Sequence, residues 1–145
     1  MNGLRLCEEN DLRHAPLVYS LLTLGEIHQN RREPDAAAIL DRAIHEAQGQ
    51  DLKVAVACAH QVLGRIAAGE GRTSAALEEF ELAATMLETL DMPERLRECL
   101  LESAAYAESI GVPATHLWKR AAYVGSRVPV RNVAEESLRP TESAG

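Results

Sequence analysis

The chain has 145 residues, of which 46% are apolar and only 3% aromatic, and its formal net charge is −7. This length suits one domain or one short array of repeats, and a composition rich in Ala and Leu favours closely packed helices over strands. The negative charge argues against direct binding to nucleic-acid phosphates, and no apolar run is long enough to span a membrane. We therefore expect no direct nucleic-acid partner and no membrane.

The cysteines and the first residues bear on the compartment. Cys7, Cys58 and Cys99 are odd in number, lie far apart and form no CxxC pair. Residues 1–10 lack the long apolar stretch of a secretory signal. Reduced thiols in the cytoplasm fit this pattern best. Lys53 and Lys119 are the only lysines among many arginines, which is a compositional hint of a bacterial source.

A short signature recurs at a fixed interval of 40 residues. It occurs at Asp11-Leu12, Asp51-Leu52 and Asp91-Met92, and Gly71 and Gly111 keep the same interval. Self-similarity with a period of 20–50 residues predicts stacked repeats, in which each unit covers the apolar face of its neighbour. We predict an array over 11–128 with units at 11–50, 51–90 and 91–128. Residues 1–10 would be a partial leading helix and 129–145 a flexible tail.

The first unit is predicted to be a pair of helices joined by a turn at 30–34. Pro16 suits the first turn of its first helix. The expected apolar stripe of this helix is Leu17, Leu21, Leu24 and Ile27. The second helix of the unit carries Ala36, Ile39, Leu40, Ala43, Ile44 and Ala47.

The second unit shows the clearest helical spacing. Asp51 is placed to cap its first helix, which contains Gly64 at a position where a glycine suggests that another backbone comes close. The apolar face of this helix is Leu52, Val54, Ala55, Cys58, Ala59, Val62, Leu63 and Ile66. The second helix presents Ala76, Leu77, Phe80, Ala83, Ala84, Leu87 and Leu90.

The third unit begins at Asp91, which has the spacing of a capping box with Glu94. Its first helix carries Leu96, Cys99, Leu100, Ala104 and Ala107, and 111–113 ends it. The partner helix carries Ala114, Leu117, Trp118, Ala121, Ala122 and Val124.

The second unit resembles the tetratricopeptide repeat, because Leu63-Gly64, Gly71, Ala76, Phe80 and Ala83 have the spacing of that family. The first and third units match in part, so the resemblance covers about 11–127. The period of 40 exceeds the 34 usual for the family and also suits HEAT-type repeats. Longer units of this kind resemble those of bacterial transcription regulators and signalling scaffolds. The resemblance implies an all-α superhelix of about three helical hairpins.

What the resemblance implies about function is protein or peptide binding without catalysis, as an adaptor or as the sensing region of a bacterial regulator. In the family, the first helix of each unit lines a concave groove. Register from Gly25, Gly64 and Ala104 then gives a set of polar, acidic and slightly apolar groove residues, which suits a peptide with one or two basic residues and an apolar anchor. These candidates are Tyr19, Leu22, Glu26, Gln29, Asn30, Cys58, Gln61, Arg65, Glu98, Leu101 and Glu108.

Other chemistry finds little support in the sequence. No H-x3-H or HExxH spacing predicts a metal site, and His28 and His60 are interpreted as half-buried packing side chains. Glu78, Glu79 and Glu81 are interpreted as the solvated face of a helix. Signatures of a nucleophile or of a phosphate loop are missing, so we predict no enzyme and no cofactor.

A second hypothesis is homodimerisation through a terminal helix pair. The last predicted helix carries Trp118 and Tyr123 beside Lys119 and Arg120. The end helices of an array must be polar or be covered, and three units bury little core per residue. Trp118 and Tyr123 are the expected dimer contacts, unless Trp118 packs on the preceding helix.

Overall fold

The computed structural model describes residues 16–127, and every secondary-structure element in that range is an α-helix. The helices are α2 (Pro16–Asn30), α3 (Ala36–Gly49), α4 (Lys53–Gly69), α5 (Thr73–Thr89), α6 (Pro93–Ser109) and α7 (Thr115–Arg127). The all-α prediction is confirmed. The predicted leading helix at 1–10 and the tail at 129–145 lie outside the described residues.

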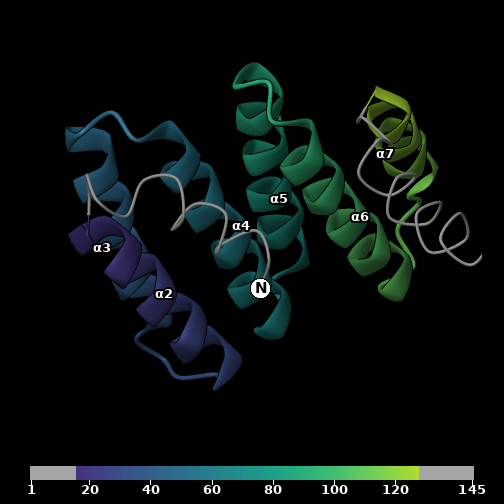
Figure 1. Ribbon diagram of the computed structural model, residues 1–145. Helices are drawn as coiled ribbons and strands as arrows, with labels where there is room; N and C mark the ends of the chain where they lie inside the picture. Colours follow the sequence, from purple (N-terminus) through teal and green to yellow (C-terminus); the bar gives the residue numbers. More distant parts are fainter. Residues whose placement is uncertain (1–15, 128–145) are drawn as a thin grey trace, which may run out of the picture.

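The helices form three hairpins, α2–α3, α4–α5 and α6–α7, that follow one another across the molecule (Figure 1). Each helix packs against the next one along the chain, and α2 also contacts α4. Figure 1 places α2 and α7 at opposite ends of the array rather than together, as a closed bundle would require. The superhelical winding of a solenoid stays a prediction.

Glycines in the first helix of two hairpins allow the second helix to pack closely. A Cβ atom at Gly64 would lie 2.8 Å from two ring carbons of Phe80, and one at Gly25 would lie 2.7 Å from Leu40. Phe80 and Leu40 are fully buried. The prediction that Gly64 faces a neighbouring helix is therefore confirmed, and this glycine–bulky pair sets the spacing of the helices within a hairpin.

The apolar stripes of the second and third hairpins are confirmed in most positions, but three of the four positions predicted for α2 are wrong. Leu17, Leu24 and Ile27 are 44%, 43% and 40% exposed. Leu21 is buried as predicted, and the buried side of α2 also carries Val18, Tyr19 and Leu22. Because α2 begins the described array, it has a neighbour on one side only, and the spacing of apolar residues does not reveal which side is covered.

The capping roles predicted for Asp51 and Asp91 are also wrong. The N-caps of α4 and α6 are Leu52 and Met92, and neither helix start has a side-chain cap hydrogen bond. Asp51 and Asp91 have φ of 56° and belong to the end of the preceding helix. Each Asp is therefore part of a helix stop, in which a left-handed residue turns the chain into the next helix.

Candidate functional site

A polar cluster joins the first helices of all three hairpins. Arg65 of α4 donates from Nε and Nη2 to the two carboxylate oxygens of Glu102 on α6, at 2.5 and 3.0 Å. Its Nη1 donates to Glu26 of α2 at 3.1 Å, and Gln61 Nε2 donates to Glu102 at 2.7 Å. We call Glu26, Gln61, Arg65 and Glu102 the first-helix cluster.

The first-helix cluster is largely withdrawn from water. Glu26 and Gln61 are buried, and Arg65 and Glu102 are partly buried. Burial alone would lower the pKa of Arg65, but the hydrogen bonds and charges of Glu102 and Glu26 outweigh it and raise the pKa. Arg65 is therefore held as a cation between two carboxylates. The bidentate pair with Glu102 and the further bond to Glu26 together hold α2, α4 and α6 in a fixed arrangement.

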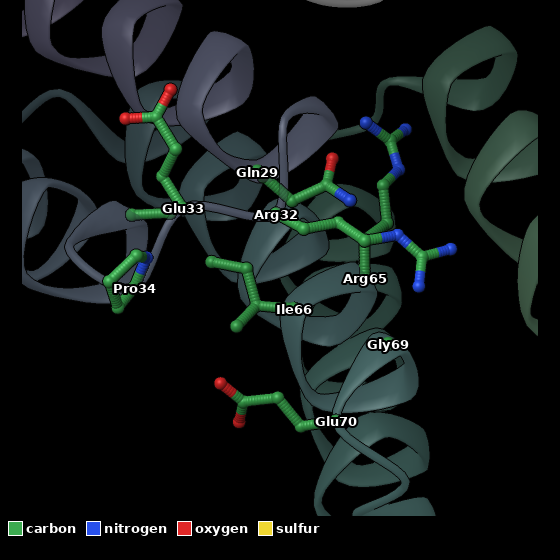
Figure 2. Close-up of a pocket in the computed structure, with 9 residues that line it drawn as sticks. Gln29, Arg32, Glu33, Pro34, Arg65, Ile66, Gly69 and Glu70 are labelled. Atoms are coloured by element: carbon green, nitrogen blue, oxygen red, sulfur yellow. The ribbon is translucent and has the colours of Figure 1, made fainter.

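A cavity of about 400 Å³ lies beside this cluster, where the ends of α2 and α4 meet the turn between α2 and α3. We call it the α2–α4 pocket. In Figure 2, Gln29, Arg32 and Arg65 lie on one side of Ile66, and Glu33 and Pro34 lie on the other. Its lining residues are Gln29, Arg32, Glu33, Pro34, Ala36, Arg65, Ile66, Gly69 and Glu70.

The charged groups around the pocket differ in whether the protein already neutralises them. Arg65 is held in the first-helix cluster, and Glu70 pairs with Arg72 at 2.7 Å. Glu33 lies 3.3 Å from His28 Nδ1. Within residues 16–127, Arg32 has no side-chain hydrogen bond or ion pair. Gln29 Oε1 is buried, also without a hydrogen-bond partner there.

The predicted groove residues separate into three groups. Tyr19, Leu22 and Cys58 are buried in the core, and Arg95 donates to Cys58 Sγ, so these three are not surface residues in this structure and the prediction is wrong for them. Glu26, Gln61 and Arg65 converge in the first-helix cluster, and Gln29 and Arg65 line the pocket. The remaining candidates, which lie apart from both, are Asn30, Glu98, Leu101 and Glu108.

The two predicted dimer contacts lie on α7 at one end of the array. Tyr123 is 65% exposed and Trp118 is 37% exposed. Trp118 Nε1 donates to Glu108 of α6 at 2.8 Å, so the indole is tied to the preceding helix as well as facing solvent. Of the seven exposed large hydrophobic side chains among the described residues, only Leu82 lies outside the first and last hairpins.

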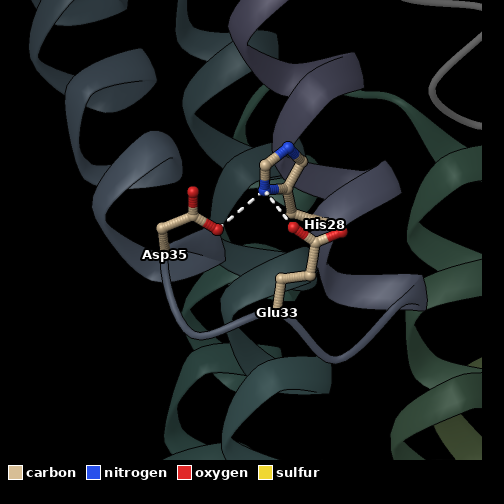
Figure 3. Close-up of side chains that lie close together, drawn as sticks. All are labelled: His28, Glu33 and Asp35. Atoms are coloured by element: carbon tan, nitrogen blue, oxygen red, sulfur yellow. Dashed lines mark hydrogen bonds and ion pairs between the residues drawn. The ribbon is translucent and has the colours of Figure 1, made fainter.

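Three side chains at the turn between α2 and α3 have the composition of a metal site. His28 Nδ1 lies 2.7 Å from Asp35 Oδ1 and 3.3 Å from Glu33 Oε2 (Figure 3). The three candidate ligand atoms lie within 4.8 Å of one another, so they can hold a cation geometrically. His60 makes a similar contact of 2.7 Å with Glu79. The pairing of imidazole with carboxylate accounts for both histidines without an ion.

Sequence reasoning missed part of the site. Arg32 of the pocket lies in the turn predicted at 30–34, and Ile66 belongs to the apolar face predicted for the second unit. The other two lining residues at the end of α4, Gly69 and Glu70, are not among the predicted site residues. Glu102 was not selected because its register differs from that of Glu26 and Arg65, which occupy matching positions after Gly25 and Gly64. The sequence does contain a signal for Glu102, which is an acidic residue on the first helix next to the one that carries Arg65.

No protein-family model, no curated protein and no solved structure matches this chain. The resemblance to tetratricopeptide repeats therefore depends on the residues already named. None of the helices within residues 16–127 has the length and apolar character needed to cross a membrane.

Proposed function

We propose that this chain is a non-catalytic module that binds a protein or a peptide, as a cytoplasmic adaptor or as the sensing region of a bacterial regulator. The observation that carries the proposal is the α2–α4 pocket, which contains two predicted groove residues, Gln29 and Arg65. It combines an apolar base with separate polar groups, as ligand sites commonly do. Arg65 and Glu70 of the lining are held in ion pairs rather than arranged as nucleophile and base, which favours binding over catalysis.

The rigidity of the surrounding helices supports the same proposal. Arg65 is fixed by Glu26 and Glu102, so one wall of the pocket is held in place before any partner arrives. A preformed wall lowers the entropy lost on binding. The proposed adaptor or sensing role depends on the family resemblance as well as on this geometry, because fold alone does not determine function.

Two glycines provide a matched test. Gly69 ends α4 and lines the pocket, whereas Gly49 ends α3 and does not, and a Cβ at either position meets no atom within 4 Å. We expect Gly69→Trp to obstruct the pocket and Gly49→Trp to leave it open. A partner captured from the native cell and then purified should bind the wild type and Gly49→Trp in calorimetry, but not Gly69→Trp. Equal binding to all three proteins would refute the proposal.

Homodimerisation is the second candidate, favoured by the exposure of Trp118 and Tyr123 on the last hairpin. A second copy would cover these side chains. Light scattering of the wild type should then report a dimer that Tyr123→Ser converts to a monomer with unchanged helicity. Leu82→Ser, at an exposed position on α5, is the control and should remain dimeric. A monomeric wild type at high concentration would rule out this candidate.

A further inference from the structure

We propose that the α2–α4 pocket takes an acidic side chain of a bound peptide, with its carboxylate on Arg32 and a neighbouring peptide N–H donated to Gln29. This inference rests on the proposed function and names the chemistry of its ligand. It adds an acidic residue to the peptide with one or two basic residues and an apolar anchor that the sequence predicts, because the pocket contains Arg32.

The charge balance of the lining selects an anion. Glu70 is compensated by Arg72, and Glu33 lies beside His28 and Arg31. Arg65 is compensated by Glu26 and Glu102. No described residue forms an ion pair with the guanidinium of Arg32, so its positive charge is not neutralised within residues 16–127. A ligand carboxylate matches it, whereas a ligand cation would meet Arg32 as a like charge.

The amide of Gln29 selects a hydrogen-bond donor. Its Oε1 atom is buried and has no partner within residues 16–127, which is costly. A rotation of the Gln29 amide that brings Oε1 into the cavity would let it accept a hydrogen bond from a ligand N–H. Gln29 and Arg32 lie on the same side of Ile66 (Figure 2). A peptide has both required groups close together, because the backbone N–H lies near the side chain of the same or the next residue. Apolar flanking residues would then contact Ile66 and Pro34.

The position of Arg32 on the backbone makes it a suitable anchor. It has φ of 58° in the turn after α2, and the N–H of the next residue, Glu33, donates to the carbonyl of His28 at 2.9 Å. This closed turn fixes the base of the Arg32 side chain while leaving its guanidinium exposed. Basic groups elsewhere on the same partner can still approach the exposed Glu98 and Glu108 of α6, so the peptide we infer carries both signs of charge.

The test uses three blocked tripeptides, Ac-Leu-Glu-Leu-NH₂, Ac-Leu-Gln-Leu-NH₂ and Ac-Leu-Lys-Leu-NH₂, titrated into isotopically labelled full-length protein and followed by NMR. We expect the Glu peptide to bind roughly three- to tenfold more tightly than the Gln peptide, since exposed and charge-assisted pairs bracket that range. Its shifts should centre on the side-chain signals of Arg32 and Gln29. Arg32→Glu should reverse the preference towards the Lys peptide.

Blocking variants separate this inference from the proposed function. Gly69→Trp should abolish the shifts of the Glu peptide, and Gly49→Trp should preserve them. Equal affinity for the Glu and Gln peptides, preference for the Lys peptide, or no binding of any probe at this pocket would overturn the inference. The inference would then fail while pocket-dependent capture of a native partner upheld the proposed function. If the Glu peptide binds as expected but Gly69→Trp leaves partner capture unchanged, the proposed function fails instead.

Discussion

Substitution of Gly64 by Ala tests the packing on which the array depends. The added Cβ would lie 2.8 Å from Cδ1 and Cε1 of Phe80 and 3.1 Å from Cζ. Phe80 has little room to move, because it is fully buried and its ring meets that of Tyr106 edge to face, with centroids 6.2 Å apart. We therefore expect Gly64→Ala to destabilise the protein, although alanine is the better helix former.

Two opposing contributions set the expected change in the free energy of unfolding for Gly64→Ala. Replacing Gly by Ala in a helix interior stabilises by about 1 kcal/mol. Inserting a carbon into a filled core costs about 1–3 kcal/mol. The net loss in free energy of unfolding is thus up to about 2 kcal/mol in the wild type. Phe80→Leu removes two of the three crowding atoms, Cε1 and Cζ, so Gly64→Ala should cost less in this background than in the wild type, by about 1–3 kcal/mol.

The assay is a double-mutant cycle by urea denaturation with far-UV circular dichroism. Gly64→Ala and Phe80→Leu should show a coupling of about 1–3 kcal/mol. Gly69→Ala is the matched control on the same helix, because its Cβ meets no atom within 4 Å, and its coupling to Phe80→Leu should be negligible. A coupling below about 0.5 kcal/mol for Gly64 would refute the inference that this glycine sets the approach of α4 and α5.

Three further predictions use the same denaturation assay. Arg65→Met should lower the free energy of unfolding by about 3 kcal/mol, because it leaves buried Glu26 without its cation. Arg72→Met removes an exposed pair with Glu70 and should cost less than about 1 kcal/mol. Equal costs would contradict the role of the first-helix cluster. Burial raises the pKa of Cys99 from 9.0 to about 12, so the native thiol keeps a proton that the unfolded chain loses, and stability should fall between about pH 9 and pH 12. The fall should be smaller in Cys99→Ala by up to about 1.4 kcal/mol per pH unit, and identical slopes would exclude Cys99 as the cause. Asp91→Gly should stabilise the protein and Gly71→Ala should destabilise it, each by about 1 kcal/mol, because both positions have positive φ. If both variants were less stable than the wild type, the side chain of Asp91 would matter more than its backbone conformation.

The sequence predicted the features that depend on contacts inside one hairpin. The stripe through Ala76, Phe80 and Ala83 and the close approach at Gly64 follow from residue size and helical spacing, and both are confirmed. In the third hairpin, the predicted stripe of α7 includes both Leu117 and Trp118, of which Leu117 is buried whereas Trp118 is 37% exposed. Adjacent side chains on a helix point about 100° apart, so the two cannot face the core equally.

Features between hairpins were harder to predict. The partners of Arg65 are Glu26 and Glu102, which lie 39 and 37 residues away and do not share one register position. Long side chains can reach a neighbouring helix from several positions, so charge pairs across helices do not follow the period that packing imposes. The pocket depends in addition on the path of the turn at 30–34, where Arg32 takes a positive φ without being a glycine.

The 40-residue signature has a physical origin that the sequence did not reveal. Residues with positive φ occur at Arg32, Asp51, Gly71, Asp91 and Gly111, at intervals of 19 or 20 residues. After each one, the next N–H donates to the carbonyl five residues back, as Leu52 does to Ala47 and Met92 to Leu87, at 2.9 and 3.0 Å. This is the bond that closes a Schellman motif, whose last residue is commonly apolar.

The backbone therefore repeats with every helix, not with every pair of helices. Asp and Gly alternate at the equivalent positions, from Asp51 through Gly71 and Asp91 to Gly111, so the sequence shows two interleaved periods of 40 where the structure has one of about 20. Both residue types tolerate the left-handed conformation, which explains why either is used. Any array of similar helices joined by this turn would have the same period. The period hence identifies a helical array in general, and the narrower resemblance to tetratricopeptide repeats stays a prediction.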